Sequence, residues 1–252
     1  MLAAGVPVLV AGLSYWELHG GGIKLSIARD WVPLGLTLLA YREMDWFTLP
    51  HDHRLERIWV HWDRLLLHEW GLASGLESAG LFLPALLELS YLLVYAVGPF
   101  ALAILYAREI RSRADRLLLV YLTGTLLAYA LFPYFPSDPP RTAFPGTDLP
   151  GVLTAIRRIN LWIVGGYGIH SSVFPSAHVS SAFSAAWALR LVIPERPRIG
   201  WAMFVYATLV AIATVYGRYH YAVDALAGFG VSLVALAVGL VAVNPSEAFP
   251  AP

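Results

Sequence analysis

The chain has no cysteine among its 252 residues, which excludes disulfide bonds and thiolate metal sites. Charged residues are also few: 13% are Asp, Glu, Lys or Arg, whereas soluble domains carry about 25%. Positive and negative charges balance, so the formal net charge of zero gives no reason to expect a nucleic-acid partner. Apolar residues make up 58% of the chain, which predicts a polytopic membrane protein.

Apolar runs near the length of about 20 residues that crosses a bilayer recur along the chain. We expect spans at 81–106, 115–134, 199–216 and 219–243, another ending at Val192, and two weaker ones at 2–17 and 31–47. This pattern predicts an all-α, polytopic integral membrane helix bundle with six to seven transmembrane helices. The N-terminus lacks the basic segment of a signal peptide and is interpreted as part of the mature chain.

Residues 48–80 combine recurring charges with tryptophans at helical spacing, which is typical of an amphipathic helix lying at the membrane surface. Several histidines, His51, His53, His61 and His68, raise the question of a metal site. We expect none, because His68-Glu69 lacks the second histidine of a zinc-protease helix and a solvated face explains the pattern. No other cofactor is expected either.

Two short loops are rich in arginine. One carries Arg108, Arg111, Arg113 and Arg116, and the other carries Arg190, Arg196 and Arg198. The positive-inside rule predicts that both lie in the cytoplasm. Counting crossings then predicts a cytoplasmic C-terminus and a long non-cytoplasmic loop at 135–172. The membrane we expect is a bacterial-type inner or plasma membrane.

The stretch 214–228 places a histidine and an aspartate where a polar loop becomes an apolar run. His220 and Asp224 are four residues apart, so on a helix they share one face. The carboxylate can then fix the tautomer of the imidazole and leave its other nitrogen free to react. Arg218 adds a cation beside them. The alternative is that Asp224 caps a helix and His220 is an ordinary interfacial histidine.

Further polar residues are expected on the same side of the membrane. Prolines at 136, 139 and 140 stiffen the backbone before Arg141. Ser176 and His178 open a helix, whose free backbone N–H groups suit a phosphate. Between Arg141 and Ser176, we expect a short surface helix at 150–165, with Arg157 and Arg158 exposed to water.

Glu88 lies about 10 Å inside a predicted span, at a rise of 1.5 Å per residue. A carboxylate at that depth is a candidate for function, since burying it in a membrane is costly. The alternative is a neutral Glu88 hydrogen-bonded to a neighbour.

Two histidines, a carboxylate and two arginines on one face suggest phosphoryl transfer through a phosphohistidine. The transferred group needs fixed cations and N–H donors around it. A nucleophilic imidazole divides the displacement into two easier steps, and a second histidine can serve as acid and then as base.

The motifs resemble those of the type 2 phosphatidic acid phosphatase superfamily. Its second motif, Pro-Ser-Gly-His, has a counterpart in Pro175-Ser-Ala-His178, and its third is matched at His220 and Asp224. The third-motif arginine would fall at Thr214, and the first motif is missing. Pro-Pro-Arg141 stands in its place, which is similar to the branch that contains inositol phosphorylceramide synthases.

The resemblance implies an enzyme in which His220 attacks phosphorus, Asp224 orients it, and His178 is general acid and base. It also implies that Arg141, Arg218 and Ser176 hold the phosphate, with Tyr216 and Glu88 in the pocket wall. The expected partners are a membrane, a lipid phosphate or phospholipid, and water or an alcohol as acceptor. We therefore divide the chain into an N-terminal part at 1–80, a catalytic transmembrane core at 81–243 and a C-terminal tail at 244–252.

Two other functions remain open at this point. A transporter or binder of anionic lipids could use Arg141 and Arg218 as an anion site, with Glu88, Gly228 and Gly230 as moving parts. A metal-dependent hydrolase built on the region from His51 to His68 is a third hypothesis.

Overall fold

The computed structural model describes residues 8–9, 11–16, 19 and 22–242, and within these residues it is helical and contains no strand. The helices in chain order are α2 Ile23–Glu43, α3 Arg54–Arg64, α4 Leu72–Glu77, α5 Phe82–Leu93, α6 Val97–Ala107, α7 Ala114–Leu131, α8 Pro140–Ala143, α9 Ala155–Tyr167, α10 Ala177–Val192, α11 Pro197–Tyr216 and α12 Ala222–Val241. The predicted tail at 244–252 and half of the predicted span at 2–17 lie outside the described residues. The all-α prediction is confirmed for the described part.

Four helical segments in the described part are long and apolar enough to cross a membrane. They are Phe82–Ala107, which joins α5 and α6, Arg111–Tyr134, Pro197–Tyr216 and Ala222–Val241. They agree closely with the four spans predicted at 81–106, 115–134, 199–216 and 219–243. The chain is therefore of the integral membrane type, while a total of six to seven spans stays a prediction.

Two helices beside these four differ from typical spans. Helix α10 has only 16 residues, and α2 carries charged residues near both of its ends. The latter begins at Ile23, well before the predicted start at residue 31, and ends at Glu43.

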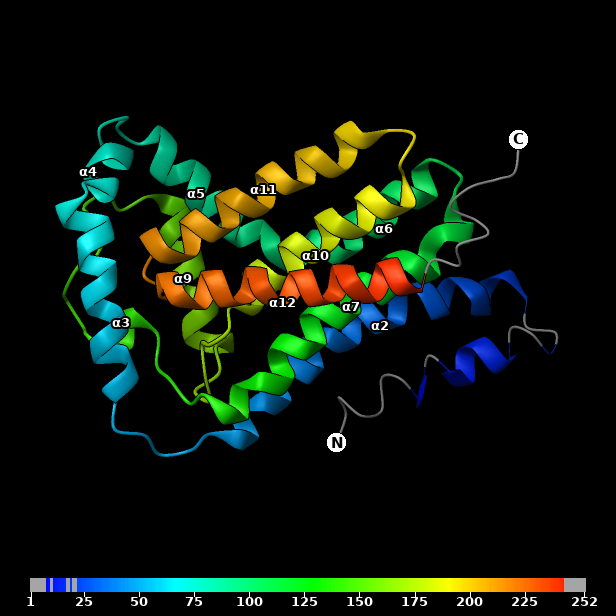
Figure 1. Ribbon diagram of the computed structural model, residues 1–252, viewed down its shortest axis with the longest axis horizontal. Helices are drawn as coiled ribbons and strands as arrows, with labels where there is room; N and C mark the ends of the chain where they lie inside the picture. Colours follow the sequence, from blue (N-terminus) through cyan, green and yellow to red (C-terminus); the bar gives the residue numbers. More distant parts are fainter. Residues whose placement is uncertain (1–7, 10, 17–18, 20–21, 243–252) are drawn as a thin grey trace.

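Helix α10 lies at the centre of the bundle, packed against α7, α11 and α12 (Figure 1). Its small residues allow this, because helices without bulky side chains can approach closely. The Ser180 hydroxyl donates to the Gly124 carbonyl of α7 at 2.8 Å, and any side chain at Gly124 would collide with Ser184. The core therefore surrounds the helix that begins just before His178.

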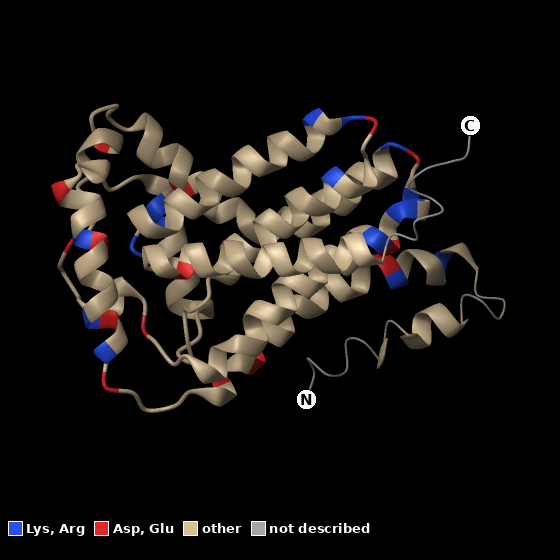
Figure 2. Cartoon of the chain, in the orientation of Figure 1, with Lys and Arg blue, Asp and Glu red and all other residues tan. Residues whose placement is uncertain are grey.

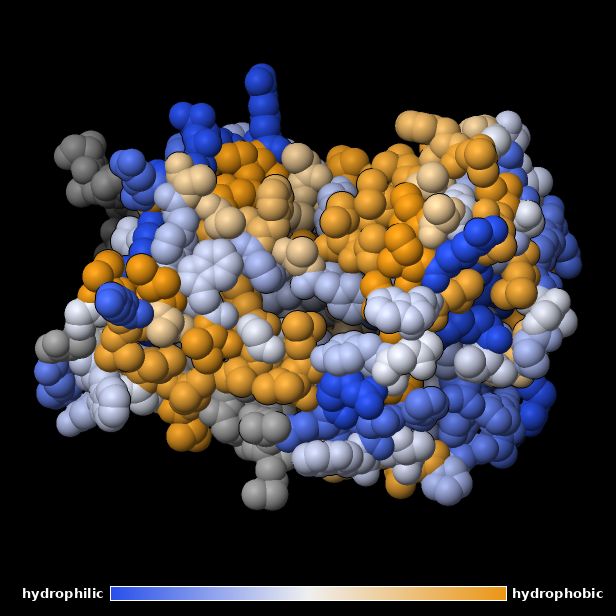
Figure 3. Space-filling view, turned by 180° about the vertical axis from the view of Figure 1, so that it is seen from behind, coloured by the Kyte–Doolittle hydropathy of each residue, from blue (hydrophilic) through white to orange (hydrophobic). Residues whose placement is uncertain are grey.

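The surface separates apolar and charged regions. Large apolar side chains such as Phe100, Val205 and Leu226 are exposed, and hydrophobic residues cover much of the middle of one face (Figure 3). Lys and Arg gather at the end where the α6–α7 and α10–α11 loops lie, away from α3 and α9 (Figure 2). The two arginine-rich loops thus share one end of the bundle, as the sequence predicts.

Helix α3 differs from the predicted surface helix in the direction of its carboxylates. Leu55, Ile58 and Trp62 are exposed, as expected of a helix at a membrane surface. However, Glu56 and Asp63 are each only 1% exposed, so a solvated charged face is wrong for these two residues. They share one face at a spacing of seven residues and turn toward loops that carry predicted site residues.

Candidate active site

Two histidines from different helices meet at the end of the bundle beside α3. His178 is in the first turn of α10, and His220 lies in the turn before α12. Nδ1 of His178 is 3.3 Å from Nε2 of His220, and the ring centroids are 5.5 Å apart. The structure thus brings together two predicted residues that are 42 positions apart in the chain.

Main-chain contacts hold the starts of α10 and α12 side by side. The Ser176 N–H donates to the Asp224 carbonyl at 2.9 Å. A Cβ on Gly228 would approach the Ser176 carbonyl oxygen to 2.4 Å, so glycine is required at this crossing. The Ser176 hydroxyl accepts from the Val179 N–H as the N-cap of α10. Ser176 is therefore placed as a helix cap, with its hydroxyl fully buried.

The contacts of His220 define its tautomer. Its Nδ1 lies 2.9 Å from the Val173 carbonyl oxygen and 3.4 Å from Oδ2 of Asp224. A carbonyl oxygen can only accept, so Nδ1 carries the proton and the neutral ring keeps a lone pair on Nε2. Asp224 lies near His220 as predicted, but the Val173 carbonyl is the closer acceptor, because Oδ2 also accepts from the Tyr221 N–H at 2.9 Å.

Burial and the neighbouring Arg141 guanidinium together lower the pKa of His220 to about 3. Its imidazole is therefore neutral at physiological pH, the form that can act as a nucleophile. His178 faces this lone pair through Nδ1, while its own Nε2 is buried and has no hydrogen-bond partner among the described residues. In the neutral ring this Nε2 is an acceptor, so a water or an alcohol hydroxyl can supply that partner.

Arg141 is the cation of the cavity. It lines the same pocket as His178, His220 and Tyr219, and its Cζ lies 5.7 Å from the centre of the Tyr219 ring. Its backbone N–H donates to the Arg218 carbonyl at 3.3 Å, which joins the proline-rich loop to the turn before His220. In the described part of the chain no carboxylate pairs with its guanidinium, which leaves it available for an anion.

Arg218 does not line this pocket, so its predicted role as a phosphate ligand needs correction. Its Nη1 lies 2.5 Å from Oδ2 of Asp63 on α3, and both side chains are 1% exposed. A buried guanidinium needs a counter-charge, and Asp63 supplies it. The other oxygen of Asp63 accepts from the Ala222 N–H at 2.9 Å, so α3 fixes both sides of the His220 turn.

Glu88 lies outside the pocket wall, contrary to prediction, within a buried polar network. Its Oε1 accepts from Arg157 at 2.7 Å, and its Oε2 accepts from Asn160 and from the Tyr219 hydroxyl, each at 2.7 Å. Arg157 is 4% exposed, so the prediction that it is wet is wrong, whereas Arg158 is exposed as predicted. Arg157 is buried because it pairs with the carboxylate of Glu88, which lies inside a predicted span.

This network reaches the catalytic candidates through stacked rings. The Tyr219 ring stacks on Tyr91 with centroids 3.9 Å apart, and Tyr91 stacks on His178 at 5.0 Å. Sequence reasoning missed Tyr91 and Tyr219, although Tyr219 directly precedes His220. Tyr216, in contrast, was predicted in the pocket wall but lies away from it, because its hydroxyl donates to Glu77 at 3.0 Å.

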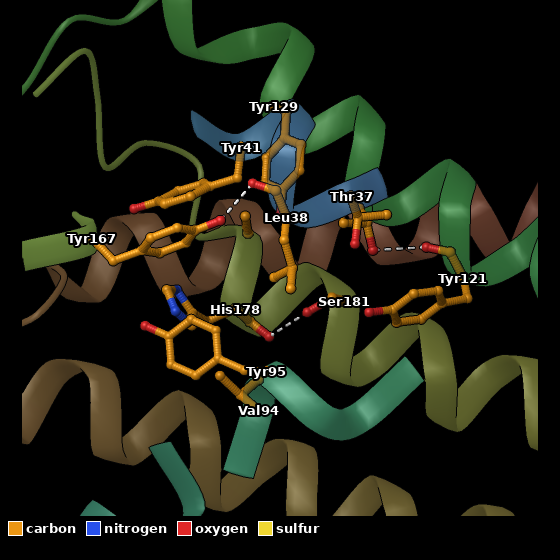
Figure 4. Close-up of a pocket in the computed structure, with 12 residues that line it drawn as sticks. Thr37, Leu38, Tyr41, Val94, Tyr95, Tyr121, Tyr129, Tyr167, His178 and Ser181 are labelled. Atoms are coloured by element: carbon orange, nitrogen blue, oxygen red, sulfur yellow. Dashed lines mark hydrogen bonds between the residues drawn. The ribbon is translucent and has the colours of Figure 1, made fainter. Parts of the chain in front are cut away.

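A second cavity adjoins His178 on the side of α2. It is lined by side chains that carry hydroxyl groups, among them Tyr41, Tyr95, Tyr129 and Tyr167 (Figure 4). Tyr41, Tyr95, Ala177 and His178 line both cavities, which therefore adjoin each other at His178. Outside these cavities, the described residues include one group of possible metal ligands, His51, His53 and Asp138.

Arg141, His178 and His220 all lie in a region of the chain that matches a known protein family. The family model described as the PAP2 superfamily matches residues 58–238, more than half of the chain. The chain belongs to the PAP2 superfamily. Membership of the PAP2 superfamily indicates phosphatase-type activity on phosphate esters. No solved structure matches the chain.

The chain is also similar to part of a PA-phosphatase related-family protein of Dictyostelium discoideum. It is 38% identical over 66 residues, which cover 26% of this chain and 11% of the relative. The PAP2 match begins at residue 58, inside α3, and so includes Asp63 as well as the histidine motifs. The division at residue 80 and the narrower likeness to inositol phosphorylceramide synthases stay predictions.

Proposed function

We propose that the protein is a metal-independent membrane lipid phosphatase or phosphotransferase that works through a phosphohistidine on His220. One observation carries the proposal: two histidines 3.3 Å apart share a buried cavity with an arginine that has no carboxylate partner in the described part of the chain. This combination supplies a nucleophile, a proton carrier and a fixed positive charge at one place.

In the first step, the lone pair on Nε2 of His220 attacks phosphorus, and the bond from phosphorus to the leaving alcohol oxygen breaks. His178 takes up a proton when the anionic substrate binds, because the negative charge favours the imidazolium, and it gives this proton to the leaving oxygen. In the second step, His178 takes a proton from water or an alcohol, whose oxygen attacks phosphorus and releases His220. The phosphoryl group replaces the contact between the two rings, and Asp224 and the Val173 carbonyl stabilise the positive charge that develops on His220.

Arg141 is the ligand we propose for the phosphate oxygens, together with the N–H groups at the start of α10. Arg218 and Glu88 do not contact the phosphate in this proposal. Arg218 fixes the turn before His220, and Glu88 fixes the Tyr219 side chain. The apolar surface around the spans supports a lipid phosphate or phospholipid as the substrate. We place the site on the non-cytoplasmic side, with α2 and α10 as additional membrane-crossing helices.

The hydroxyl-lined cavity beside His178 supports transfer to an alcohol such as inositol, in addition to hydrolysis. A site with many hydroxyl groups can hydrogen-bond a polyol, and it discriminates strongly against a compound without those groups. Transfer is the reaction of the branch that the Pro-Pro-Arg141 sequence resembles. Incubation with a lipid substrate, with and without inositol, should yield a new phosphoinositol product only if this cavity holds the acceptor.

The central test is covalent trapping. Wild-type protein incubated with a 32P-labelled lipid phosphate in EDTA should retain acid-labile, base-stable label after rapid quenching, and His220→Ala should retain none. His170→Ala is the matched control, because His170 lies in the same part of the chain with its side chain 79% exposed. Wild-type turnover by His220→Ala would overturn the proposal.

The alternative function is a transporter or binder of anionic lipids that returns its ligand unchanged. This alternative takes Gly228 as one of its moving parts, but Gly228 lies in tight contact with Ser176. That packing favours a rigid site over a moving one. Recovery of intact lipid phosphate after prolonged incubation, with binding retained, would favour the alternative.

A further inference from the structure

Four side chains converge where the N-terminal end of α3 meets the proline-rich loop. His51 Nε2 and His53 Nδ1 each lie 3.8 Å from Oδ2 of Asp138. The same two nitrogens lie 2.8 Å and 3.2 Å from Oε1 of Glu56. Ligand atoms of His51, His53 and Asp138 all fall within 4.8 Å of one another. Two imidazoles and two carboxylates therefore face one small volume outside the catalytic cavity.

One ring nitrogen of His51, Nε2, lacks a hydrogen-bond partner in this volume. Its Nδ1 lies 3.3 Å from the Leu49 carbonyl oxygen, which can only accept, so Nδ1 carries a proton. In the neutral ring, Nε2 then presents a lone pair toward the Glu56 carboxylate. This nitrogen is buried and makes no hydrogen bond among the described residues, despite its 2.8 Å contact with Glu56. A cation beside the two atoms would remove this conflict.

The charges lead to the same conclusion. Glu56 is 1% exposed, and its Oε1 already accepts from the Asp138 N–H at 3.1 Å. Asp138 brings a second carboxylate to the same two rings, with its side chain 30% exposed. Two converging carboxylates repel each other unless positive charge lies between them. A divalent cation placed among these groups balances the charge of both carboxylates.

We propose that His51, His53 and Asp138, supported by Glu56, form a binding site for a divalent transition-metal ion of the Zn²⁺ type. Imidazole and carboxylate ligands without thiolates suit such ions. Tetrahedral Zn²⁺ places its ligand atoms about 3.4 Å apart, so the observed separations of 3.8 Å require only a small closure. Donation from His51 Nδ1 to a backbone carbonyl is the usual support for a metal-bound imidazole.

The ion would connect segments that are far apart in the chain. Asp138 is 82 residues beyond Glu56 and lines a cavity together with Pro139 and Arg141. Binding would therefore fix the loop that positions Arg141, without contact with the reacting phosphorus. The PAP2 match begins at residue 58, so His51, His53 and Glu56 lie before it, whereas Asp138 lies within it.

This site differs from the metal site considered in the sequence, because it uses only two of the four histidines between residues 51 and 68. His61 and His68 lie outside the group, and the third ligand comes from the loop before Arg141. No spacing rule within residues 51–68 indicates a partner so far along the chain.

The test is direct metal binding by the full-length protein in detergent. After treatment with a chelator and its removal, we expect the wild-type protein to take up one Zn²⁺ per chain by elemental analysis. Co²⁺ should give the visible absorption bands of a low-symmetry site. In His53→Gln and in Asp138→Asn the dissociation constant for Zn²⁺ should rise on the order of 100-fold. His61→Gln, which changes an exposed histidine of α3 outside the group, should bind as the wild type does.

Thermal unfolding gives a second readout for variants that fold less well. Zn²⁺ should raise the unfolding temperature of the wild type and of His61→Gln, but not that of Asp138→Asn. Absence of stoichiometric Zn²⁺ in the wild type would overturn the proposal. Equal affinity in the wild type and both ligand variants would also overturn it. Neither readout depends on catalysis, so both remain valid if the proposed phosphohistidine is wrong.

Discussion

The two arginine-bearing loops beside the histidine pair have the same kind of side chain in opposite surroundings. Arg141, in the proline-rich loop, lines the cavity of His178 and His220 and has no carboxylate partner among the described residues. Arg218, in the turn before His220, is buried and held by Asp63 of α3. The first guanidinium is available for a substrate, and the charge of the second is already balanced within the protein.

This difference shows that proximity to a catalytic motif does not define a ligand. Arg218 is only two residues from His220, whereas Arg141 is far from it in sequence. The available charge of a guanidinium depends on which carboxylate it meets in the fold. A role in folding and a role in binding should therefore respond differently to substitution of the two arginines.

Replacement of Arg218 by alanine should mainly destabilise the fold. It leaves the Asp63 carboxylate buried without its partner, which typically costs about 3–5 kcal/mol. Thermal unfolding in detergent measures this loss. The double variant Arg218→Gln with Asp63→Asn should recover part of the stability and of the activity. If stability is unchanged in Arg218→Ala and only substrate affinity falls, the comparison between the two arginines is wrong.

Replacement of Arg141 by glutamine should leave the unfolding temperature unchanged and slow the reaction. Loss of one charged group that stabilises the transition state costs about 3 kcal/mol, so kcat/KM should fall on the order of 10²-fold. Steady-state turnover of a lipid phosphate measures it. Arg158→Gln, which changes an exposed arginine of α9, is the matched control and should behave as the wild type does.

The same variant should change the pH dependence. Arg141 helps burial to lower the pKa of His220 to about 3, so glutamine at this position should raise that pKa. The acid limb of kcat/KM should then move to higher pH in Arg141→Gln than in the wild type on the same substrate. Coincident acid limbs would show that Arg141 does not act on His220.

A related effect on stability follows from the direction of this pKa shift. The pKa of His220 falls from 6.5 to about 3 on folding, so the unfolded chain takes up a proton first as the pH decreases. The contribution of the neutral, buried ring is complete above pH 6.5 and is lost progressively between 6.5 and 3. Unfolding measured across this interval should show the loss in the wild type and a smaller one in His220→Gln.

Tyr219→Phe should have the smallest effect. It removes the hydroxyl that donates to Glu88 and keeps the ring stacked on Tyr91, so a stability loss of about 1 kcal/mol is expected. Activity should stay close to that of the wild type. A large fall in kcat without loss of stability would instead make the Tyr219 hydroxyl part of the reaction.

The sequence predicted the parts of the site that depend on local spacing and on membrane topology. Pro-Ser-Ala-His178 and the four-residue spacing of His220 and Asp224 each suit the start of a helix, and counting crossings placed them at one end. These signals need only neighbouring residues and hydrophobic periodicity. The four spans that the structure supports were predicted for the same reason.

The supporting carboxylates could not be assigned in this way. Glu56 and Asp63 read as solvated charges of an amphipathic helix, because their partners are loops far along the chain. Glu88 and Arg157 were each identified, but as a pocket residue and a wet residue, since neither sequence position indicates the other. One signal was present: Glu56, Trp59 and Asp63 share one face of α3, where a tryptophan lies between two acidic residues.

The bond from the Ser176 N–H to the Asp224 carbonyl, with Gly228 pressed against Ser176, has a consequence for how such an enzyme can diversify. The backbone itself sets the spacing between the two imidazoles, so side chains around the cavity can vary without disturbing it. If the proposed reaction holds, different substrates could be accommodated by changes in α2 or in the proline-rich loop, while the two imidazoles keep their alignment.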